Sequence, residues 1–556
     1  MIEAGVIAKR PPSEVMRLRR LGSLHQSRLS FMRILVRRMV REQWATSTPV
    51  FDIDSAGVGR AVYTVKTPQR AYSLIAFAHD IPDEKRTDRV IADVWDTTFC
   101  LFDGVPTQQD LERLEQNVPL QEAGRISEKE LCLSRANRSV RVWSQVVDAL
   151  AEGRQPELEE LISVGYLMRT TAVYGSGKFG AADRETYAHR PEMQAPFQVE
   201  MLTVYLIRTF VRDLVQHMAK IKGGKNAVAL DPEIARRLGI GNSTGLGMAP
   251  FIVNHPVLFN NWIAAREEAI ARVRSQKHTT DDLTQLFLYV YHLSEKSIQR
   301  WATEHRIQKN RLTVLREDIR TLELFLQEFD WTIDYPWDFL VRWASSKLSV
   351  EGQELLNSLI LEPHDTIVEP LEHSMSDEDS EAFYIDGSML VKEIKSLLHE
   401  QFAWALELDW QKREHSERLW YVSEEKLEPR VGSRFEEELD AYEQPLAPAR
   451  DAAALYKALS ARDGTEPIDQ FLAQHPEHRH TVRRLQLCRT APYGEIRDNT
   501  IAADMLPIDM LRAKLSFFGA THFDPRSDRW VRVKLFSGAP YADELHEEQN
   551  DLWIYH

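Results

Sequence analysis

Residues 61–104 read AVYTVKTPQRAYSLIAFAHDIPDEKRTDRVIADVWDTTFCLFDG, and this stretch decides the class of the N-terminal part of the chain. It contains four runs rich in β-branched, aromatic and small apolar residues, namely AVYTV, AYSLIAFAHD, VIADVWD and TTFCLFDG. Such runs, bounded by short polar connections, are typical of β-strands. Because none of the connections is long enough for a crossover helix, the stretch predicts antiparallel pairing.

Helices are expected directly after these strands. The segment TQQDLERLEQN predicts a helix over 107–117. A second helix is predicted over 127–152, because Ser127 and Glu130 have the spacing of a capping box. Together with the strands, these helices define an expected α+β domain at 49–155.

The rest of the chain has a helical period. Expected helices span 157–168, 196–222, 231–238, 257–275, 280–304, 307–329, 336–348, 388–412 and 451–460. We expect a helical domain at 156–361 and a C-terminal helical region at 388–556, which ends in an alternating run, RWVRVKLFSG (529–538), that is predicted to join the N-terminal sheet as an edge strand. The expected fold class is mainly α with a smaller α+β N-terminal part, that is, an antiparallel sheet unit plus a large bundle-like helical domain.

An acidic linker is predicted between the two helical parts, at 362–387. Residues 362–386 contain nine acidic residues and neither Lys nor Arg. Such a charge run is usually solvated, and its prolines prevent a continuous helix. We therefore expect an exposed connector here.

The first 48 residues are predicted to contain a basic amphipathic helix. Residues 1–42 carry ten Lys or Arg against three Glu, so their net charge is +7 and the remaining residues carry −22. Between Arg28 and Trp44 the apolar residues recur every three or four positions, with arginines on another face. A helix packed on the acidic body or on a partner subunit fits this pattern. The nearby acidic residues and the lack of a cleavage pattern disfavour a membrane-surface helix or an organelle presequence.

The composition bears on several classes of function. Hydrophobic residues make up 43% and charged residues 28%, which is typical of a soluble globular protein. Since no stretch reaches the roughly 18 apolar residues of a membrane helix, we expect a cytoplasmic protein without a membrane span. An acidic body repels nucleic acid. Three cysteines, with no HExxH motif and no dinucleotide fingerprint, predict neither a metal site nor another cofactor.

Two glycine-rich segments interrupt the helical part, and we expect them to bind ligand. The first is RTTAVYGSGKFG, residues 169–180. Glycines let a backbone approach a ligand closely, and Arg169 and Lys178 offer cations to a carboxylate or phosphate on either side of Tyr174. Val173 and Phe179 break the spacing of a Walker A loop. A plain turn with solvated cations is the alternative.

The second segment is GIGNSTGLGMAPFIVNHP, residues 239–256. It contains G-x-S-x-G around Ser243, but a nucleophile elbow needs a strand before the serine and a helix directly after it. The preceding ARRLGI predicts a helix end, and prolines follow. Asn242, Ser243 and Thr244 instead predict a polar nest for an anion.

His255 and Asn254 end this second segment. His255 is a candidate acid or base because its pKa is ordinarily near neutrality, although capping the next helix is an equal alternative. Over residues 241–256 the segment is similar to the glycine- and serine-rich loop ending in Asn-Pro of the fumarase and aspartase group of lyases, without the paired serines or the Met-Pro-x-Lys run of that group. This resemblance implies a lyase with an all-α fold.

These patterns together predict an enzyme that acts on a small carboxylate- or phosphate-bearing substrate by proton abstraction or elimination. We expect Arg169 and Lys178 to hold the anion, Asn242, Ser243, Thr244 and Asn254 to orient it, and Tyr174 or His255 to move a proton. The alternatives are a serine hydrolase with Ser243 as nucleophile, and a non-catalytic helical scaffold or regulatory subunit. The expected partners are a small anionic molecule and a second copy of the chain in a homodimer, and not nucleic acid.

Overall fold

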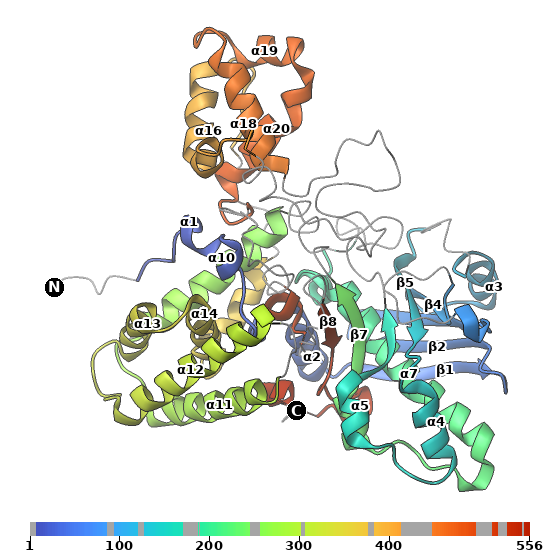
Figure 1. Cartoon of the computed structure of the whole chain (residues 1–556). Helices are drawn as coiled ribbons and strands as arrows, with labels where there is room; N and C mark the ends of the chain where they lie inside the picture. The colour runs from blue at the N-terminus through green and yellow to red at the C-terminus, as the bar shows by residue number, and fades with distance from the viewer. Residues whose placement is uncertain are drawn as a thin grey trace.

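The computed structural model describes residues 7–85, 94–119, 127–170, 187, 189–244, 256–301, 306–375, 383–412, 447–495, 514–520, 531–546 and 550–555. The described part is mainly helical and contains one eight-stranded sheet (Figure 1). This agrees with the predicted class, mainly α with a smaller α+β part.

The strands of the sheet follow one another in chain order. They are β1 (Ala45–Ile53), β2 (Gly59–Lys66), β3 (Ala71–Ala78), β4 (Thr97–Asp103), β5 (Glu130–Arg138), β6 (Tyr166–Thr170), β7 (Gly239–Thr244) and β8 (Val531–Leu535). Neighbouring strands are antiparallel except β6 and β7, which are parallel. β8 is the edge strand beside β7, where the sequence places an edge strand.

The prediction of an antiparallel sheet is therefore wrong at β6 and β7. A parallel pair requires a long crossover connection, usually through a helix. Here the connection contains α7 (Gln198–Gly223) and α8 (Pro232–Arg237). The short connections between residues 61 and 104 contain no information on this later pair, so their antiparallel pattern does not extend to it.

The predicted helix over 127–152 is also wrong in its first half, which forms strand β5. Ser127 and Glu130 do form the expected contacts, since the Ser127 backbone N–H and hydroxyl donate to the Glu130 carboxylate at 3.2 and 2.9 Å, but they close a turn before a strand. Both faces of β5 are buried, so the strand lacks the alternating polarity that identifies a half-exposed strand. Helix α4 (Trp143–Ala151) forms the second half.

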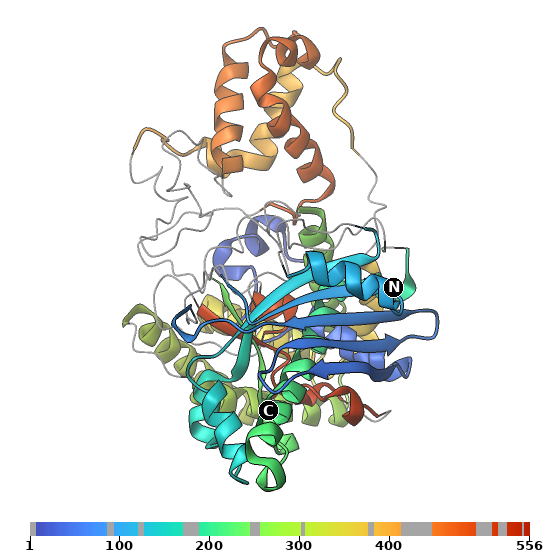
Figure 2. The ribbon, with the colours of Figure 1, turned by 90° about the vertical axis from the view of Figure 1, so that its right-hand side faces the viewer.

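Helices cover both faces of the sheet. α7 packs on one face, against β2, β3, β4, β5 and β7, and most of its side chains are buried. α3 (Gln108–Asn117) covers the other face, where a second apolar cluster joins Leu111 and Leu114 to Val62, Ile75, Phe77 and Phe102 (Figure 2). The central strands are therefore sandwiched between helices.

The remaining helices form two groups. The first lies beside the sheet and contains α10 (Pro256–Arg274), α11 (Asp281–Gln299), α12 (Arg306–Glu328), α13 (Pro336–Lys347) and α14 (Val350–Leu359) (Figure 1). The second lies farthest from the sheet and contains α16 (Val391–Leu406), α18 (Ala447–Ser460), α19 (Ile468–Gln474) and α20 (Arg479–Thr490). Shorter helices are α1 (Pro12–Val15), α5 (Leu158–Val164), α15 (Asp365–Val368), the 3₁₀ segments η6 (Glu369–Met375) and η10 (Asp551–Tyr555), and a π-helical turn at Lys514–Phe518.

The predicted N-terminal amphipathic helix is confirmed as α2 (Phe31–Arg41). Its apolar side chains are buried except for the half-buried Val40, and it packs against α7. One of its basic side chains is fully buried, because Arg33 is 0% exposed and makes two hydrogen bonds, of 2.7 and 2.6 Å, to the Glu362 carboxylate. The helix is therefore held by ion pairs as well as by apolar packing.

The exposure predicted for the acidic linker is wrong for part of residues 362–375. Glu362 and Glu372 are buried, and η6 packs on α10. Glu362 pairs with Arg33, Glu369 with Arg28 and Glu372 with Arg37, and each arginine lies more than 300 positions earlier in the chain. A charge run that has no basic neighbours in sequence acquires them through the fold. Residues 376–382 lie outside the described part.

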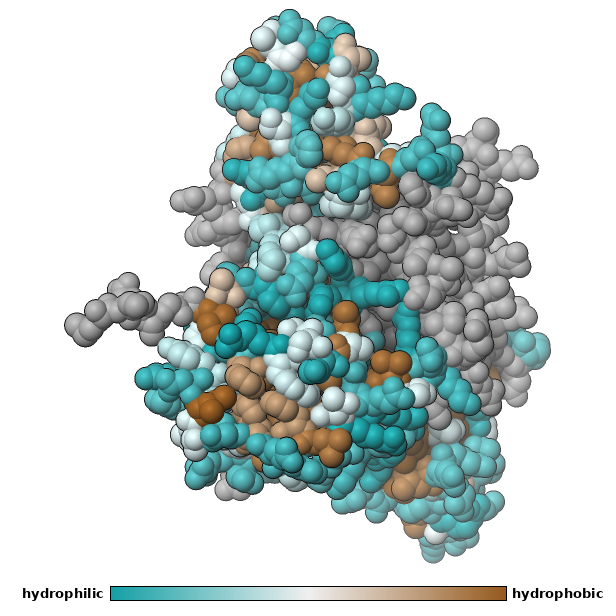
Figure 3. Space-filling view, turned by 60° about the vertical axis from the view of Figure 1, so that its left-hand side comes forward, coloured by the Kyte–Doolittle hydropathy of each residue, from teal (hydrophilic) through white to brown (hydrophobic). Residues whose placement is uncertain are grey.

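Among the described helices, none is long and apolar enough to cross a membrane. In the view of Figure 3, polar side chains cover most of the described surface, with smaller apolar groups among them.

Candidate functional site

The two predicted ligand-binding segments lie side by side where strands β6 and β7 pair. The first follows β6 and the second includes β7, and these strands pair in parallel with Arg169 opposite Gly241 and Thr170 opposite Asn242. Parallel strands have their carboxyl ends at the same edge. In open α/β sheets, ligands bind in the crevice outside such strand ends.

Local sequence positions both strands. Gly165 ends α5 in the left-handed conformation (φ 74°), which lets the chain turn directly into β6. Asp231 caps α8 by accepting hydrogen bonds from two backbone N–H groups, and Pro232 occupies the first turn. α8 ends at Arg237, so β7 can begin two residues later.

Gly241 is required by packing against Tyr166. A Cβ added at Gly241 would lie 2.6–2.7 Å from three atoms of the Tyr166 ring, so the ring lies over the glycine. Gly239 is similarly constrained, since its Cβ would lie 2.5 Å from the Leu535 carbonyl oxygen. These two glycines therefore allow close approach of the protein to itself.

Arg169 and Asn242 lie on neighbouring strands but point to opposite faces of the sheet. Side chains alternate between faces along a strand. Thr170 pairs with both Asn242 and Ala136. Ala136 pairs with Thr97, two residues before Phe99 on β4, and the Phe99 ring contacts Phe210 of α7. Asn242 therefore faces α7, where its amide donates to the Thr170 carbonyl at 3.3 Å. Arg169, one position earlier than Thr170, points to the other face.

Three side chains gather around Gly241 on the Arg169 face. Arg169 on β6 and Lys534 on β8 are the cross-strand neighbours of Gly241, and each is 4% exposed. The Lys534 amino group donates to the Ile162 carbonyl at 3.1 Å, so its charge lies toward the amino end of β6. The Tyr166 hydroxyl is buried and has no hydrogen-bond partner among the described residues. This face thus combines two cations with one unsatisfied hydroxyl.

Several predicted site residues lie outside the described part of the chain. They are Tyr174, Lys178, Asn254 and His255. For Ser243 and Thr244 the backbone is described, and it pairs with Arg532 and Val531 of β8. Arg169 and Asn242 are therefore the predicted residues whose side chains can be compared with the expected site.

The secondary structure around Ser243 differs from the expectation for the G-x-S-x-G segment. A strand, β7, does precede Ser243, although ARRLGI was expected only to end a helix. Ser243 nevertheless still lies within the strand and pairs with Arg532, and the next described helix begins at Pro256. A nucleophile elbow places its serine at the turn between strand and helix. The described geometry gives no support to the serine hydrolase alternative.

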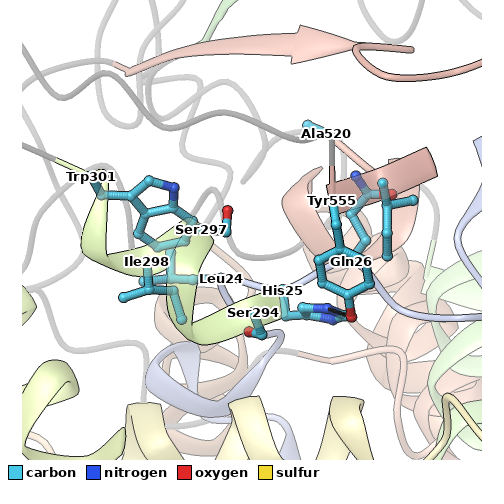
Figure 4. A pocket seen from close by; sticks show the side chains of 10 residues that line it. Leu24, His25, Gln26, Ser294, Ser297, Ile298, Trp301, Ala520 and Tyr555 are labelled. Carbon is cyan, nitrogen blue, oxygen red and sulfur yellow. Dashed lines mark hydrogen bonds between the residues drawn. The ribbon is translucent and has the colours of Figure 1, made fainter. Parts of the chain in front are cut away.

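A second polar site, not anticipated from the sequence, lies around His25 and Tyr555. His25 Nε2 and the Tyr555 hydroxyl are joined by a hydrogen bond of 2.8 Å beside a small cavity (Figure 4). The two residues are 530 positions apart. A single histidine in SLHQS has no local signal that marks it, so only the fold identifies this site.

Within the described residues, no group of three or more His, Cys, Asp or Glu side chains is arranged to hold a metal ion. Comparison of the chain with protein-family models, with curated proteins and with solved structures gives no match.

Proposed function

We propose that the chain is an enzyme that binds a small carboxylate- or phosphate-bearing substrate at the carboxyl ends of β6 and β7, with Arg169 as the main cation. The observation that supports this most is the parallel pairing of β6 and β7, which places Arg169 of the first glycine-rich segment opposite Gly241 of the second. An arginine fork at such an edge matches the two oxygens of a carboxylate or phosphate.

The proposed reaction is proton abstraction followed by elimination. A base removes the proton next to the carboxylate, the C–H electron pair forms the new double bond, and the leaving group departs with its own bonding pair. Charge that develops on the carboxylate in this step is stabilised by a fixed cation, the role proposed for Arg169. Tyr174 and His255 stay the predicted proton-transfer groups. The Tyr166 hydroxyl is a further proton donor that the described geometry offers on the same face.

Isothermal titration calorimetry with inorganic phosphate and with succinate, at constant ionic strength, tests the anion site. Replacing Arg169 by Gln should weaken binding by about ten- to a hundred-fold, because a charge-assisted hydrogen bond contributes about 1.5–3 kcal/mol. Arg169→Lys keeps the positive charge but loses the forked guanidinium. Its affinity for the anion should therefore lie between those of the wild type and Arg169→Gln.

Arg60→Gln is the matched control, since Arg60 is a cation of the same sheet whose partner is the exposed Glu115. It should bind as the wild type does. If wild type binds no anion, or if Arg169→Gln and Arg60→Gln bind equally well while folded, the proposed site is wrong and the scaffold alternative becomes the better one. A cytoplasmic location and a homodimer stay predictions.

A further inference from the structure

A larger cavity lies at the other end of β7, between α8, α11 and η10. Its volume is about 300 Å³, at the lower end of the range for small-molecule sites. Tyr289, Leu293, Leu552 and Trp553 supply aromatic and aliphatic walls, and Arg236 and Asn550 also line it. The Arg236 guanidinium is bonded to Glu544 at 3.0 Å, so its charge already has a partner.

Tyr555 lines both this outer cavity and a smaller inner one of about 30 Å³. The inner cavity lies along the same helix, α11, where Ser294 and Ser297 follow Leu293. His25 approaches Tyr555 from the N-terminal segment, and Ser294 lies next to the imidazole (Figure 4). Tyr555 thus stands where the two cavities meet.

The inner cavity is lined by buried polar groups that lack partners. Among the described residues, His25 Nδ1, Gln26 Oε1 and Ser294 Oγ have no hydrogen-bond partner, and the three residues are 9%, 5% and 3% exposed. Buried polar groups in folded proteins are ordinarily satisfied by protein, water or ligand. A volume of this size accepts one or two waters or the polar end of a ligand.

The charges near the inner cavity are already neutralised. Burial lowers the pKa of His25 to about 4, so its ring is neutral at neutral pH, and burial also raises the pKa of the Tyr555 hydroxyl. The charged groups that act on the His25 ring, Glu362 and Arg33, pair with each other through two hydrogen bonds. A site with these groups favours a neutral hydrogen-bonding partner over an ion.

The segment that carries Tyr555 is firmly attached. Asp551, at the start of η10, accepts hydrogen bonds from Arg33 at 3.2 Å and from Arg37 at 2.7 Å. Although burial opposes it, these two arginines lower the pKa of Asp551 well below its usual range. The walls formed by η10 are therefore preformed, which reduces the entropy lost when a ligand binds.

We propose that the outer cavity binds a neutral small molecule with an apolar body of about the size of one aromatic ring, and that Tyr555, held by His25, hydrogen-bonds a hydroxyl or amide group of that molecule. A tyrosine hydroxyl has one donor and two acceptor positions, so its bond to His25 leaves capacity for a ligand. His25 acts as a positioning residue. Arg236 lines this cavity, and β7 begins three residues later at Gly239, so the site lies at the amino end of β7. The proposed anion site is at the carboxyl end, so neither proposal depends on the other.

Saturation-transfer NMR and calorimetry with full-length protein test this site, with benzyl alcohol and benzamide as neutral probes and benzoate and benzylamine as charged ones. We expect the neutral probes to bind more tightly than either charged probe. Leu293→Trp, which fills the outer cavity, should abolish binding. Leu286→Trp makes the same change at a 40%-exposed position of α11 that does not line the cavity, and it should leave binding unchanged.

Tyr555→Phe keeps the ring and removes the hydroxyl. It should weaken binding of the neutral probes by about three- to ten-fold, as expected for one neutral hydrogen bond, and leave toluene, which cannot form that bond, unaffected. Tighter binding of benzoate than of benzamide, or equal binding by Leu293→Trp and Leu286→Trp, would overturn the proposal. Phosphate and succinate binding report on Arg169 separately, so failure of one site is distinguishable from failure of the other.

Discussion

At the scale of single residues, the glycines show where sequence patterns are ambiguous. A glycine that allows a ligand to approach and a glycine that accommodates a neighbouring ring are identical in sequence. Gly241 of β7 accommodates a neighbouring ring, because the Tyr166 ring occupies the space beside it. Arg169 was identified as a candidate from the chemistry of its side chain. That Arg169 and Asn242 point to opposite faces of the sheet depends on the register of β6 and β7, which the sequence of one segment does not contain.

Gly241→Ala tests this packing directly. The added methyl group would lie 2.6 Å from the Tyr166 ring, so we expect a loss of about 1–3 kcal/mol in the free energy of unfolding, as for other overpacked sites. Gly464→Ala is the control, because its Cβ would have one close neighbour, the Lys392 Cβ at 3.3 Å. Urea denaturation measures both. Equal stability of the two variants would contradict the placement of the Tyr166 ring.

His25 should make stability depend on pH. Its pKa in the folded protein, about 4, lies below the ordinary histidine value of 6.5, so the unfolded chain takes up the proton first as the pH falls. Stability is then full above pH 6.5 and declines toward pH 4, by up to about 3 kcal/mol from this one group. His25→Gln should remove that part of the decline. Parallel pH profiles for wild type and variant would show that His25 is not buried as described.

At the scale of elements, the sequence predicted best those segments whose pattern is local. The helix over 107–117 and α2 follow from capping residues and apolar period. The strand β5 was missed because both of its faces are buried. The acidic segment was assigned to solvent because its arginine partners lie in α2 and just before it, hundreds of residues away. Long-range charge pairing has no local signature.

Arg33→Met tests the link between α2 and the acidic segment. Removing one partner leaves the Glu362 carboxylate buried without its main counter-charge, which should cost about 3–5 kcal/mol. Combining Arg33→Met with Glu362→Leu should recover much of this loss, because no unpaired charge remains. Arg41→Met, at an exposed position of α2, is the control. If the double variant is no more stable than Arg33→Met, the pair does not make the contact described.

At the scale of the whole molecule, segments from both ends of the chain complete the body. β8 pairs with β7, and η10 is tied to α2 through Asp551. The predicted division separates an N-terminal sheet unit from helical regions. In the structure, however, α7 lies between β6 and β7 in sequence and packs on the sheet. Contacts of this kind follow from topology and not from composition.

Removing residues 550–556 should therefore weaken the body as a whole. The truncation leaves Arg33 and Arg37 without Asp551 and His25 without Tyr555. We expect a single cooperative unfolding transition at a lower temperature, with a loss of several kcal/mol, about the cost of breaking one buried ion pair. Scanning calorimetry measures it, with removal of His556 alone as the control. An unchanged transition would mean that η10 does not stabilise the body.

The carboxyl ends of β6 and β7 are proposed to form an anion site around Arg169. A crystal structure grown with selenate, an oxyanion whose selenium scatters anomalously, tests this most directly. We predict an anomalous peak with selenate oxygens about 3 Å from the Arg169 guanidinium nitrogens, and no such peak in crystals of Arg169→Gln. Selenate bound only at exposed arginines, with none beside Arg169, would contradict the account.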